Sequence, residues 1–476
     1  MTQEQKRAIV IGGGITGLAA AYRLKCEAEN RGIPLEIILL EASSRVGGVI
    51  QTEHRDGFII EHGPDAFIST KPWAKALCEE LGIADKLIGT NPKVRRSFVI
   101  RKGKLLPVPE GFYMMAPGSF GPFLKSPIFS WRGKFRIVLD LFISRRDNID
   151  DESVADFVRR RLGTEAFERM AQPMIGGIYT SDAENLSLKA TFPRFLEMER
   201  EHGSIIKALL AQKRKAAQTS RDTSGPRYSL FLSFEDGMQT LVDTLAESFS
   251  GCIRFLSRVN TIQQKESGKG WLVCLEDGKV LETDLLCLAL PAPQTSKILS
   301  GVSPSLAEKL STIPYTSSAT VNLAFRREDI PHPLNGMGFV VPVTEQLNLV
   351  GCSFSSVKFE NRVPADHVLL RAFVGGNTFE GKVNGNLTQN DLVSTALKDV
   401  SNLLGIKKEP LFSVVSEHSQ AMAQYLVGHQ KLVQEIEKLT KDLPGLVLAG
   451  NAYHGIGIPD CIHSGEQAAL TLLDAI

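Results

Sequence analysis

Residues 8–41, AIVIGGGITGLAAAYRLKCEAENRGIPLEIILLE, decide the fold of this 476-residue chain. Ala8–Ile11 is a short, wholly apolar run, which is typical of a strand buried in a parallel sheet. Thr16–Asn30 has the apolar spacing of a helix, and Leu35–Leu40 repeats the buried-strand pattern and ends on Glu41. The stretch therefore predicts a strand–helix–strand unit with a right-handed crossover.

A glycine fingerprint joins the first strand to the helix. Gly12, Gly14 and Gly17 have the spacing G-x-G-x-x-G: the first permits a tight turn, the second lets a pyrophosphate approach the backbone, and the third lets helix and strand pack closely. The free N–H groups and the dipole at the start of the helix favour phosphate charge. Glu41, at the end of the second strand, can accept hydrogen bonds from ribose hydroxyls. In this context a dinucleotide site is favoured over a purely structural turn.

Two further motifs favour FAD over NAD, which the fingerprint alone does not separate. Arg45-Val46-Gly47-Gly48 offers a cation and a second pair of close-approach glycines near the same pyrophosphate. Gly455-Ile456-Gly457-Ile458-Pro459 lies between a strand and a helix, whose N-terminus can direct its N–H groups at a reduced, anionic flavin ring. The alternative for this second motif is an ordinary strand-to-helix turn.

Composition argues against several other classes of protein. The 54 basic and 53 acidic side chains leave a formal charge of +1, which gives no global field for holding nucleic acid. Seven cysteines, an odd number without metal-ligand spacing, favour a reducing cytosol over a disulfide framework or a metal site. The long charge-free runs are interrupted by Pro, Gly, Ser and Thr, so we expect no membrane-spanning helix.

The later part of the chain returns to strand patterns. We expect strands at Ile253–Ile262 and Trp271–Leu275, the latter followed by the hairpin signal Asp277-Gly278. Buried strands are also expected at Asp284–Leu290 and Gly445–Gly450. These segments predict one nucleotide-binding domain built from three separated stretches of chain, with other domains inserted between them.

Four early motifs resemble the amine oxidase-type FAD superfamily. They are Gly12–Gly17, Glu41-Ala42, Arg45-x-Gly47-Gly48 and Glu61-His62-Gly63-Pro64-Asp65. Later motifs resemble, more specifically, the bacterial protoporphyrinogen and coproporphyrinogen III oxidases of haem biosynthesis. These are Gly177-Ile178-Tyr179, Leu186-Ser187-Leu188, Thr191-Phe192-Pro193, Tyr425-x-x-Gly428-His429 and Gly455–Ile462. The motifs follow one another in order along nearly the whole chain.

The resemblance implies an α/β fold with α+β insertions. It comprises a Rossmann-like FAD-binding domain of the hydroxybenzoate-hydroxylase type, a mixed-sheet substrate domain and a helical lobe at the substrate opening. The expected FAD-binding segments are 1–60, 218–298 and 409–476. The helical lobe is expected at 61–217 and the substrate-binding sheet at 299–408.

The resemblance also implies a reaction. The family binds FAD tightly but non-covalently and removes six electrons from a porphyrinogen in three cycles, with O2 as acceptor and H2O2 as product. This chemistry belongs to the cofactor, so we name no catalytic side chain and no metal ligand. The motifs favour coproporphyrinogen III as substrate, with protoporphyrinogen IX as a second one.

The candidate site residues are carried over from these motifs. Those expected to bind FAD are Gly12, Gly13, Gly14, Ile15, Thr16, Gly17, Glu41, Ala42, Arg45, Gly48, Val49, Gly63, Pro64, Asp65, Ala66, Val259, His418, Gly450, Ile456, Gly457 and Ile458. Lys71, Gly177 and Ile178 are expected to bind the porphyrinogen, Lys71 through a propionate and the other two through a flat backbone surface. The alternative for Lys71 is an exposed surface charge. His418 stands where the family commonly has Trp, so we expect altered packing of the flavin or adenine there without loss of FAD.

The segment Val108–Trp131 is crowded with aromatic side chains, and basic residues follow it. The aromatic residues are Phe112, Tyr113, Phe120, Phe123, Phe129 and Trp131. We favour the core of the helical lobe for most of them. The alternative is an exposed apolar lip that contacts the substrate, a membrane surface or another enzyme of the haem pathway.

Two other functions share this architecture. One is a different FAD oxidase or desaturase of the same superfamily, and the other is a non-catalytic binding protein of the GDP-dissociation-inhibitor type. An amine oxidase would need an aromatic cage for the amine, which the sequence does not clearly supply. The Gly455–Pro459 turn argues for a retained flavin. We therefore expect a cytoplasmic porphyrinogen oxidase, attached to a membrane at most peripherally.

Overall fold

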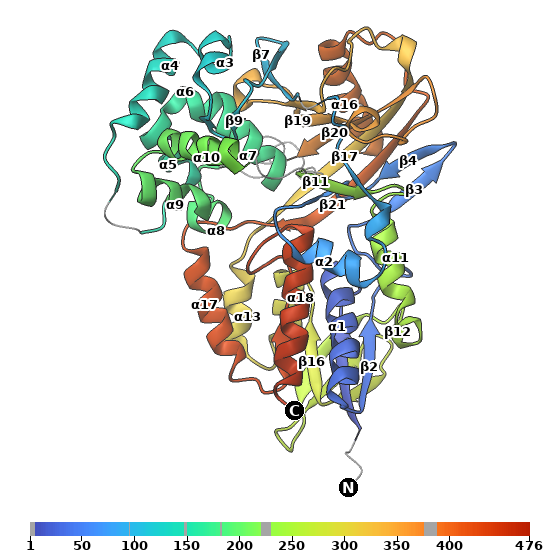
Figure 1. Ribbon diagram of the computed structural model, residues 1–476. Helices are drawn as coiled ribbons and strands as arrows, with labels where there is room; N and C mark the ends of the chain where they lie inside the picture. The colour runs from blue at the N-terminus through green and yellow to red at the C-terminus, as the bar shows by residue number, and fades with distance from the viewer. Residues whose placement is uncertain (1–4, 95, 147–149, 181–182, 220–229, 376–387) are drawn as a thin grey trace.

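The computed structural model describes residues 5–94, 96–146, 150–180, 183–219, 230–375 and 388–476. Its first unit is a parallel sheet of five strands in the order β12-β2-β1-β16-β22 (Figure 1). The strands are β12 (Ile253–Arg254), β2 (Leu35–Leu40), β1 (Lys6–Ile11), β16 (Leu285–Leu288) and β22 (Leu446–Leu448). Three stretches of chain far apart in sequence therefore build one sheet, as the sequence predicted.

Helices α1 (Ile15–Arg31) and α18 (Ile458–Leu473) lie side by side on one face of this sheet (Figure 1). Their apolar residues share one core with Ala8 and Val10 of β1. A glycine lets the two helices approach closely, because a Cβ at Gly465 would lie 2.2 Å from the carbonyl oxygen of Thr16. This packing brings the N-termini of both helices to the same edge of the sheet.

The opposite face of the sheet is covered by a three-stranded antiparallel sheet and helices. These elements are β13 (Val259–Gln264), β14 (Trp271–Leu275), β15 (Val280–Thr283), α12 (Ala292–Leu299), α13 (Pro304–Ser311) and α17 (His429–Thr440). The expected hairpin at Asp277-Gly278 is confirmed by the pairing of β14 with β15. The single strand expected at Ile253–Ile262 is wrong. The chain breaks at Leu256, whose φ is +52°, and passes from one sheet to the other.

A second, seven-stranded sheet forms the other large unit, in the order β21-β17-β20-β19-β18-β7-β8. Its strands are β7 (Phe98–Arg101), β8 (Lys104–Pro107), β17 (Tyr315–Arg326), β18 (Gly338–Val340), β19 (Leu349–Phe354), β20 (His367–Gly375) and β21 (Phe412–Ala423). Strands β18 and β7 pair in parallel and the other neighbours are antiparallel, so the sheet is mixed. Helix α16 (Gln389–Leu404) shares a core with it.

This mixed sheet differs from the boundaries expected from the sequence. Strands β7 and β8 come from within the expected helical lobe, 61–217, and β21 comes from within the expected third FAD segment, 409–476. The reason is pairing over long distances: β7 pairs with β18, and β21 pairs along most of β17. No local pattern marks such partners.

The helical lobe packs around a core of its own. Its helices are α3 (Phe120–Lys125), α4 (Trp131–Val138), α5 (Val154–Leu162), α6 (Thr164–Ala166), α7 (Gln172–Tyr179), α8 (Leu188–Thr191), α9 (Pro193–His202) and α10 (Ile205–Thr219), with a π-helical turn at Phe167–Ala171. Phe123 and Phe129 are buried in this core, and Phe112 and Phe120 pack against it. Trp131, in contrast, is 74% exposed. The aromatic segment is therefore mostly core, with one end on the surface.

Smaller elements connect these units. They are the hairpin β3 (Thr52–Arg55) and β4 (Phe58–Glu61), the sheet of β5 (Phe67–Ile68), β11 (Phe231–Phe234) and β6 (Leu87–Gly89), the pair β9 (Phe112–Tyr113) and β10 (Ala116–Pro117), and helices α2 (Trp73–Glu80), α11 (Gln239–Glu247) and α14 (Ser355–Lys358). None of the helices in the described ranges is long and apolar enough to span a bilayer.

Candidate functional site

The glycine turn after β1 has the geometry that the fingerprint predicts. Gly12 has φ +108°, and a Cβ there would lie 2.5 Å from the carbonyl oxygen of Ala289. A Cβ at Gly17 would lie 1.9 Å from the carbonyl oxygen of Gly12, so helix α1 could not approach β1 with any side chain there. Around Gly14 no heavy atom of the described residues lies within 4 Å of the Cβ position. The first and third glycines thus serve packing, and the second faces open space.

Glu41 lies beside this turn, as predicted. Its carboxylate accepts hydrogen bonds from the amides of Gly13 and Ser43, both at 2.7 Å. The carbonyl of Glu41 accepts from the amide of Ser257 at 2.8 Å. This bond brings the start of β13, with the candidate Val259, to the end of β2. The candidates Ile15 and Thr16 are buried in the first turn of α1, and Ala42 directly follows Glu41.

The loop Arg45–Gly48 lies against the glycine turn. The amide of Gly47 donates to the carbonyl of Gly13 at 2.7 Å, and a Cβ at Gly48 would lie 3.3 Å from the Cα of Gly14. The Arg45 guanidinium donates to the carbonyls of its own loop, Val46, Gly48 and Ile50. Burial lowers its pKa. Arg45 therefore braces the loop, and its contact with a pyrophosphate stays a prediction.

The loop Glu61–Ala66 lies next to the Arg45–Gly48 loop. A Cβ at Gly63 would lie 1.7 Å from the carbonyl oxygen of Val49, so these two candidates meet backbone to backbone. Asp65 pairs with Lys358 at 2.8 Å and lies near Arg371. Burial alone would raise the pKa of Asp65, but the nearby Lys358 and Arg371 bring it below its ordinary value. The carboxylate of Asp65 is thus held ionised by two cations, Arg371 on strand β20 of the mixed sheet and Lys358 at the end of helix α14.

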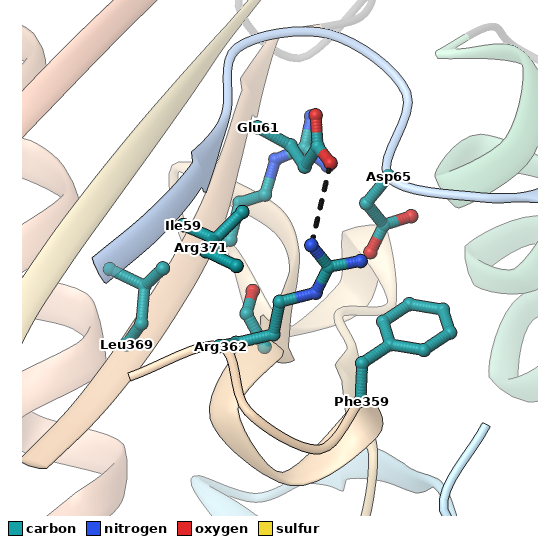
Figure 2. Close-up of a pocket in the computed structure, with 8 residues that line it drawn as sticks. Ile59, Glu61, Asp65, Phe359, Arg362, Leu369 and Arg371 are labelled. Carbon is teal, nitrogen blue, oxygen red and sulfur yellow. Dashed lines mark ion pairs between the residues drawn. The ribbon is translucent and has the colours of Figure 1, made fainter. Parts of the chain in front are cut away.

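A small charged cavity lies behind this loop (Figure 2). Its lining includes Glu61, Asp65, Arg362 and Arg371, with Arg362 Nη1 3.8 Å from Glu61 Oε1. Arg371 donates to the carbonyl of Gly63. The charged residues that line this cavity therefore hold the loop Glu61–Ala66 in place.

His418 lies close to the same loop. It is on β21, and its Nε2 lies 2.9 Å from the carbonyl oxygen of His62, to which it donates. Burial lowers the pKa of His418, so the neutral ring is favoured. The structure places His418 against the backbone beside Gly63. Altered packing of the flavin or adenine there stays a prediction.

The turn before α18 carries the last group of candidates. Gly450 and Gly455 have φ +131° and +150°, and Gly457 caps the helix in extended conformation without a side-chain cap. Ile456 and Ile458 flank this cap. Asp460, in the first turn, pairs with Lys71 at 2.6 Å. The candidate Lys71 is therefore paired at the N-terminus of α18 while its side chain is 43% exposed, and its contact with a propionate stays a prediction.

A second cavity lies between α7 and the mixed sheet. It is lined by Gly176, Gly177, Thr180, Ser318, Val350, Phe373 and Val374. A Cβ at Gly177 would meet only Val340 within 4 Å, at 3.7 Å, among the described residues. Gly177 therefore lines a cavity, and its contact with the porphyrinogen stays a prediction, whereas the side chain of Ile178 lies outside the described part of the chain. Burial and then the Asp460 carboxylate raise the pKa of Tyr179, at the end of the same helix.

Several residues of this region escaped sequence reasoning. Lys358, Arg371 and Asp460 hold candidate residues but lie hundreds of positions away from them, and no spacing rule connects them. The sequence identified Tyr425 as part of a motif, but it did not predict which groups Tyr425 contacts. Its hydroxyl donates to the carbonyl of Asn451 and accepts from the amide of Gly455, both at 2.8 Å.

The comparisons with known proteins agree with this geometry. Residues 15–473 match the family model for flavin-containing amine oxidoreductases. The coproporphyrinogen III oxidase of Bacillus subtilis (strain 168) is 33% identical over 99% of this chain and 100% of its own length. That of Staphylococcus aureus is 33% identical over 98% of each chain, and the protoporphyrinogen oxidase of Bos taurus is 32% identical over 98% of each.

Solved structures show the same fold. A structure from Exiguobacterium sp. 255-15, assigned there as a protoporphyrinogen oxidase, has a TM-score of 0.85 at 29% identity and covers 98% of this chain and 99% of its own. A reduced UDP-galactopyranose mutase has a TM-score of 0.71 at 15% identity, covers 99% of this chain and 96% of its own, and supports the fold alone.

Proposed function

The chain belongs to the flavin-containing amine oxidoreductase family, and we propose that within this family it oxidises a porphyrinogen to a porphyrin in haem biosynthesis, with FAD as cofactor. The observation that carries the proposal is 33% identity to three bacterial coproporphyrinogen III oxidases over 98–99% of this chain. The protoporphyrinogen oxidases among the relatives are 29–32% identical. We therefore take coproporphyrinogen III as the preferred substrate and protoporphyrinogen IX as a second one.

We propose that FAD lies along the edge of the five-stranded sheet where β1 and β2 end. The residues present there suit it: Gly14 faces open space, the Glu41 carboxylate lies beside it, and two helix N-termini point to the same edge. The loop Gly63–Ala66 and the segment Ile456–Ile458 would extend the site toward the flavin. Val259, His418 and Gly450 complete the proposed set.

When bound, FAD supplies the redox chemistry, accepting two electrons in each of three cycles and passing them to O2. The overall balance is the loss of six hydrogens from the porphyrinogen and the reduction of three O2 to three H2O2. The chain's own residues bind FAD and the porphyrinogen, orient the two toward each other and exclude water. O2 as acceptor is part of the proposal.

We propose that the macrocycle lies across the mouth of the cavity beside α7. Gly177 supports this, because its bare backbone offers a surface against which a flat ring can lie. Lys71 would meet a propionate at the N-terminal end of α18, where the carboxylate of Asp460 holds it now. Propionate binding at Lys71 would therefore replace or share this ion pair.

The proposal is tested by an aerobic assay of the purified yellow protein with coproporphyrinogen III and protoporphyrinogen IX, each followed by porphyrin fluorescence against a no-enzyme blank. We expect FAD-dependent oxidation, faster with coproporphyrinogen III, and three H2O2 for each porphyrin formed. A flavin-bearing protein that oxidises neither faster than the blank would refute the porphyrinogen reading. A colourless protein would favour a binding protein without flavin.

A matched pair of variants tests the cavity. Gly177→Leu would fill it without a clash at the Cβ, so we expect a KM raised about tenfold or more with normal flavin content. Gly121→Leu is the control, since Gly121 lies in α3 with no heavy atom of the described residues within 4 Å of its Cβ position. Equal KM values in the two variants would place the substrate elsewhere.

We also propose that the protein docks peripherally on anionic membranes through an aromatic face on α4 and the turn after it. Trp131, Phe135 and Phe142 are 74%, 67% and 79% exposed. Residues 121–146 hold six basic side chains and one acidic one; Asp140 and Lys134 are buried and Arg136 is half-buried, which leaves four exposed cations, Lys125, Arg132, Arg145 and Arg146, and no exposed acid. Exposed aromatics among cations are typical of a surface that inserts between anionic headgroups.

Vesicle sedimentation tests this docking. The protein should sediment with phosphatidylglycerol vesicles and not with phosphatidylcholine vesicles, and the double variant Trp131→Ser, Phe135→Ser should stay in the supernatant. The control is Val280→Ser, which removes a 54% exposed apolar side chain elsewhere. Wild-type protein that remains free of anionic vesicles at low salt contradicts the docking and leaves the oxidase proposal intact.

A further inference from the structure

A short segment joins the helical lobe to the turn that precedes α18. This segment, Gln424–Gly428, is called the strap below; it follows β21 and leads into α17. Leu426 of the strap forms an antiparallel bridge with Leu186 of the lobe. The carboxylate of Asp151, also in the lobe, accepts the Gly428 amide at 2.8 Å. The strap is thus fixed to the lobe along its length.

The strap begins beside the cavity at α7. Gln424 is 3% exposed, and its amide nitrogen donates to the carbonyl of Tyr179 at 3.1 Å and to the hydroxyl of Thr316 at 3.0 Å. Tyr179 ends α7, and the next residue, Thr180, lines the cavity. A change in the cavity wall therefore reaches the strap through one hydrogen bond.

The next residue of the strap reaches the other way. Tyr425 is 1% exposed, and its ring stacks on His429 with centroids 3.9 Å apart and planes at 11°. Its hydroxyl donates to the carbonyl of Asn451 and accepts from the amide of Gly455, both at 2.8 Å. One hydroxyl therefore holds both ends of the turn Asn451–Gly455.

The position of this turn determines where helix α18 begins. Gly457 caps α18 only two residues after Gly455, and the cap has no side-chain partner. Free amides and the helix dipole at this end stabilise negative charge, and they do so over short distances. A small movement of the turn would therefore change how strongly the helix end stabilises a reduced, anionic flavin.

We propose that Tyr425 is a positioning residue that fixes the N-terminus of α18 against the flavin, and that the strap couples this position to the lobe that forms the cavity. The inference rests on the proposal above that Ile456–Ile458 contact the flavin. It assigns Tyr425 no contact with the reacting atoms. It identifies a physical connection by which the porphyrinogen side of the molecule influences the potential of the flavin.

The test is the midpoint potential of the bound flavin, measured by dye equilibration during anaerobic reduction without porphyrinogen. Tyr425→Phe leaves the Gly455 amide without its partner, so the potential should become more negative than in the wild type and FAD should bind about tenfold more weakly. Tyr453→Phe is the matched control. Tyr453 lies in the same turn, and its buried hydroxyl has no hydrogen-bond partner among the described residues.

A second variant tests the coupling from the lobe. Asp151→Ala removes the anchor of the strap and touches neither Tyr425 nor the turn, and its potential should move in the same direction as that of Tyr425→Phe. The inference is overturned if the flavin of Tyr425→Phe has the same midpoint potential as that of the wild type. If Tyr425→Phe does not fold, the inference is overturned by an unchanged midpoint potential in Asp151→Ala. The potential is measured without porphyrinogen, so it reports the positioning role of Tyr425 even if the protein oxidises no porphyrinogen. The failure of the positioning role can therefore be distinguished from the failure of the proposed function.

Discussion

A buried histidine next to the strap predicts how the protein responds to acid. His429 is 4% exposed, stacks on Tyr425, and donates from Nε2 to the carbonyl of Tyr453. Its pKa is lowered from 6.5 to about 4, chiefly by burial and to a smaller extent by His454, while the Tyr453 carbonyl and Asp151 act in the opposite direction. The ring is therefore neutral in the folded protein at neutral pH.

The size of the effect follows from the two pKa values. Between pH 6.5 and about 4 the unfolded chain binds a proton at this ring and the folded chain does not. The stability due to the neutral ring is therefore present above pH 6.5 and is lost as the pH falls. Between pH 7 and pH 5 this loss amounts to about 2 kcal/mol of unfolding free energy.

Two measurements check the prediction. In protein labelled with 13C at histidine Cε1, the signal that is absent from His429→Phe should not shift between pH 8 and pH 5. In urea unfolding, the wild type should lose about 2 kcal/mol more than His429→Phe between pH 7 and pH 5. His202→Gln, which removes an exposed ring, should behave as the wild type. A His429 signal that titrates near pH 6.5, or equal pH dependence in His429→Phe and wild type, refutes the reasoning.

Three further predictions concern the fold and the FAD site. Gly17→Ala should purify without flavin, because its Cβ would lie 1.9 Å from the carbonyl oxygen of Gly12; a normal ratio of flavin to protein absorbance contradicts this. Asp140→Ala should lower the unfolding free energy by about 3–5 kcal/mol, since it leaves the fully buried Arg161 with Glu199 alone and removes the acceptor of the Ser204 hydroxyl and the Ile206 amide; an unchanged denaturation midpoint would argue against it. Leu256→Gly should raise stability by roughly 0.5–1 kcal/mol, because Leu256 has φ +52° and is 76% exposed; a lower Tm would show that the left-handed backbone is not strained.

Short, mainly apolar strands and tight turns could be predicted from local sequence. Leu35–Leu40 and Trp271–Leu275 are strands with the expected bounds, and the turn Asp277-Gly278 pairs its flanking strands. Ile253–Ile262 was expected to be one strand because apolar and β-branched residues recur along it. The break falls at Leu256, where neither glycine nor proline marks it. The left-handed conformation there is imposed by the passage between two sheets.

In the candidate site, too, local features could be predicted from the sequence and contacts between distant residues could not. The packing roles of Gly12 and Gly17 follow from their spacing, because both act within one turn of chain. The partner of Asp65 is Lys358, 293 positions away, and that of Lys71 is Asp460, 389 positions away. Such pairs depend on how the sheets stack, so the charges that support the site could not be read from the sequence.

Parallel pairing explains why three distant motifs could be expected to meet at the proposed FAD site. Strands that run parallel end at one edge of their sheet, so whatever follows β1, β2, β16 and β22 must meet there. The glycine turn, Glu41 and the turn before α18 are three of these continuations. The cavity at Gly177 obeys no such rule, since it lies where a helix of the lobe crosses the face of the mixed sheet. The proposed place of the cofactor therefore follows from strand ends, whereas the proposed substrate rests on the relatives.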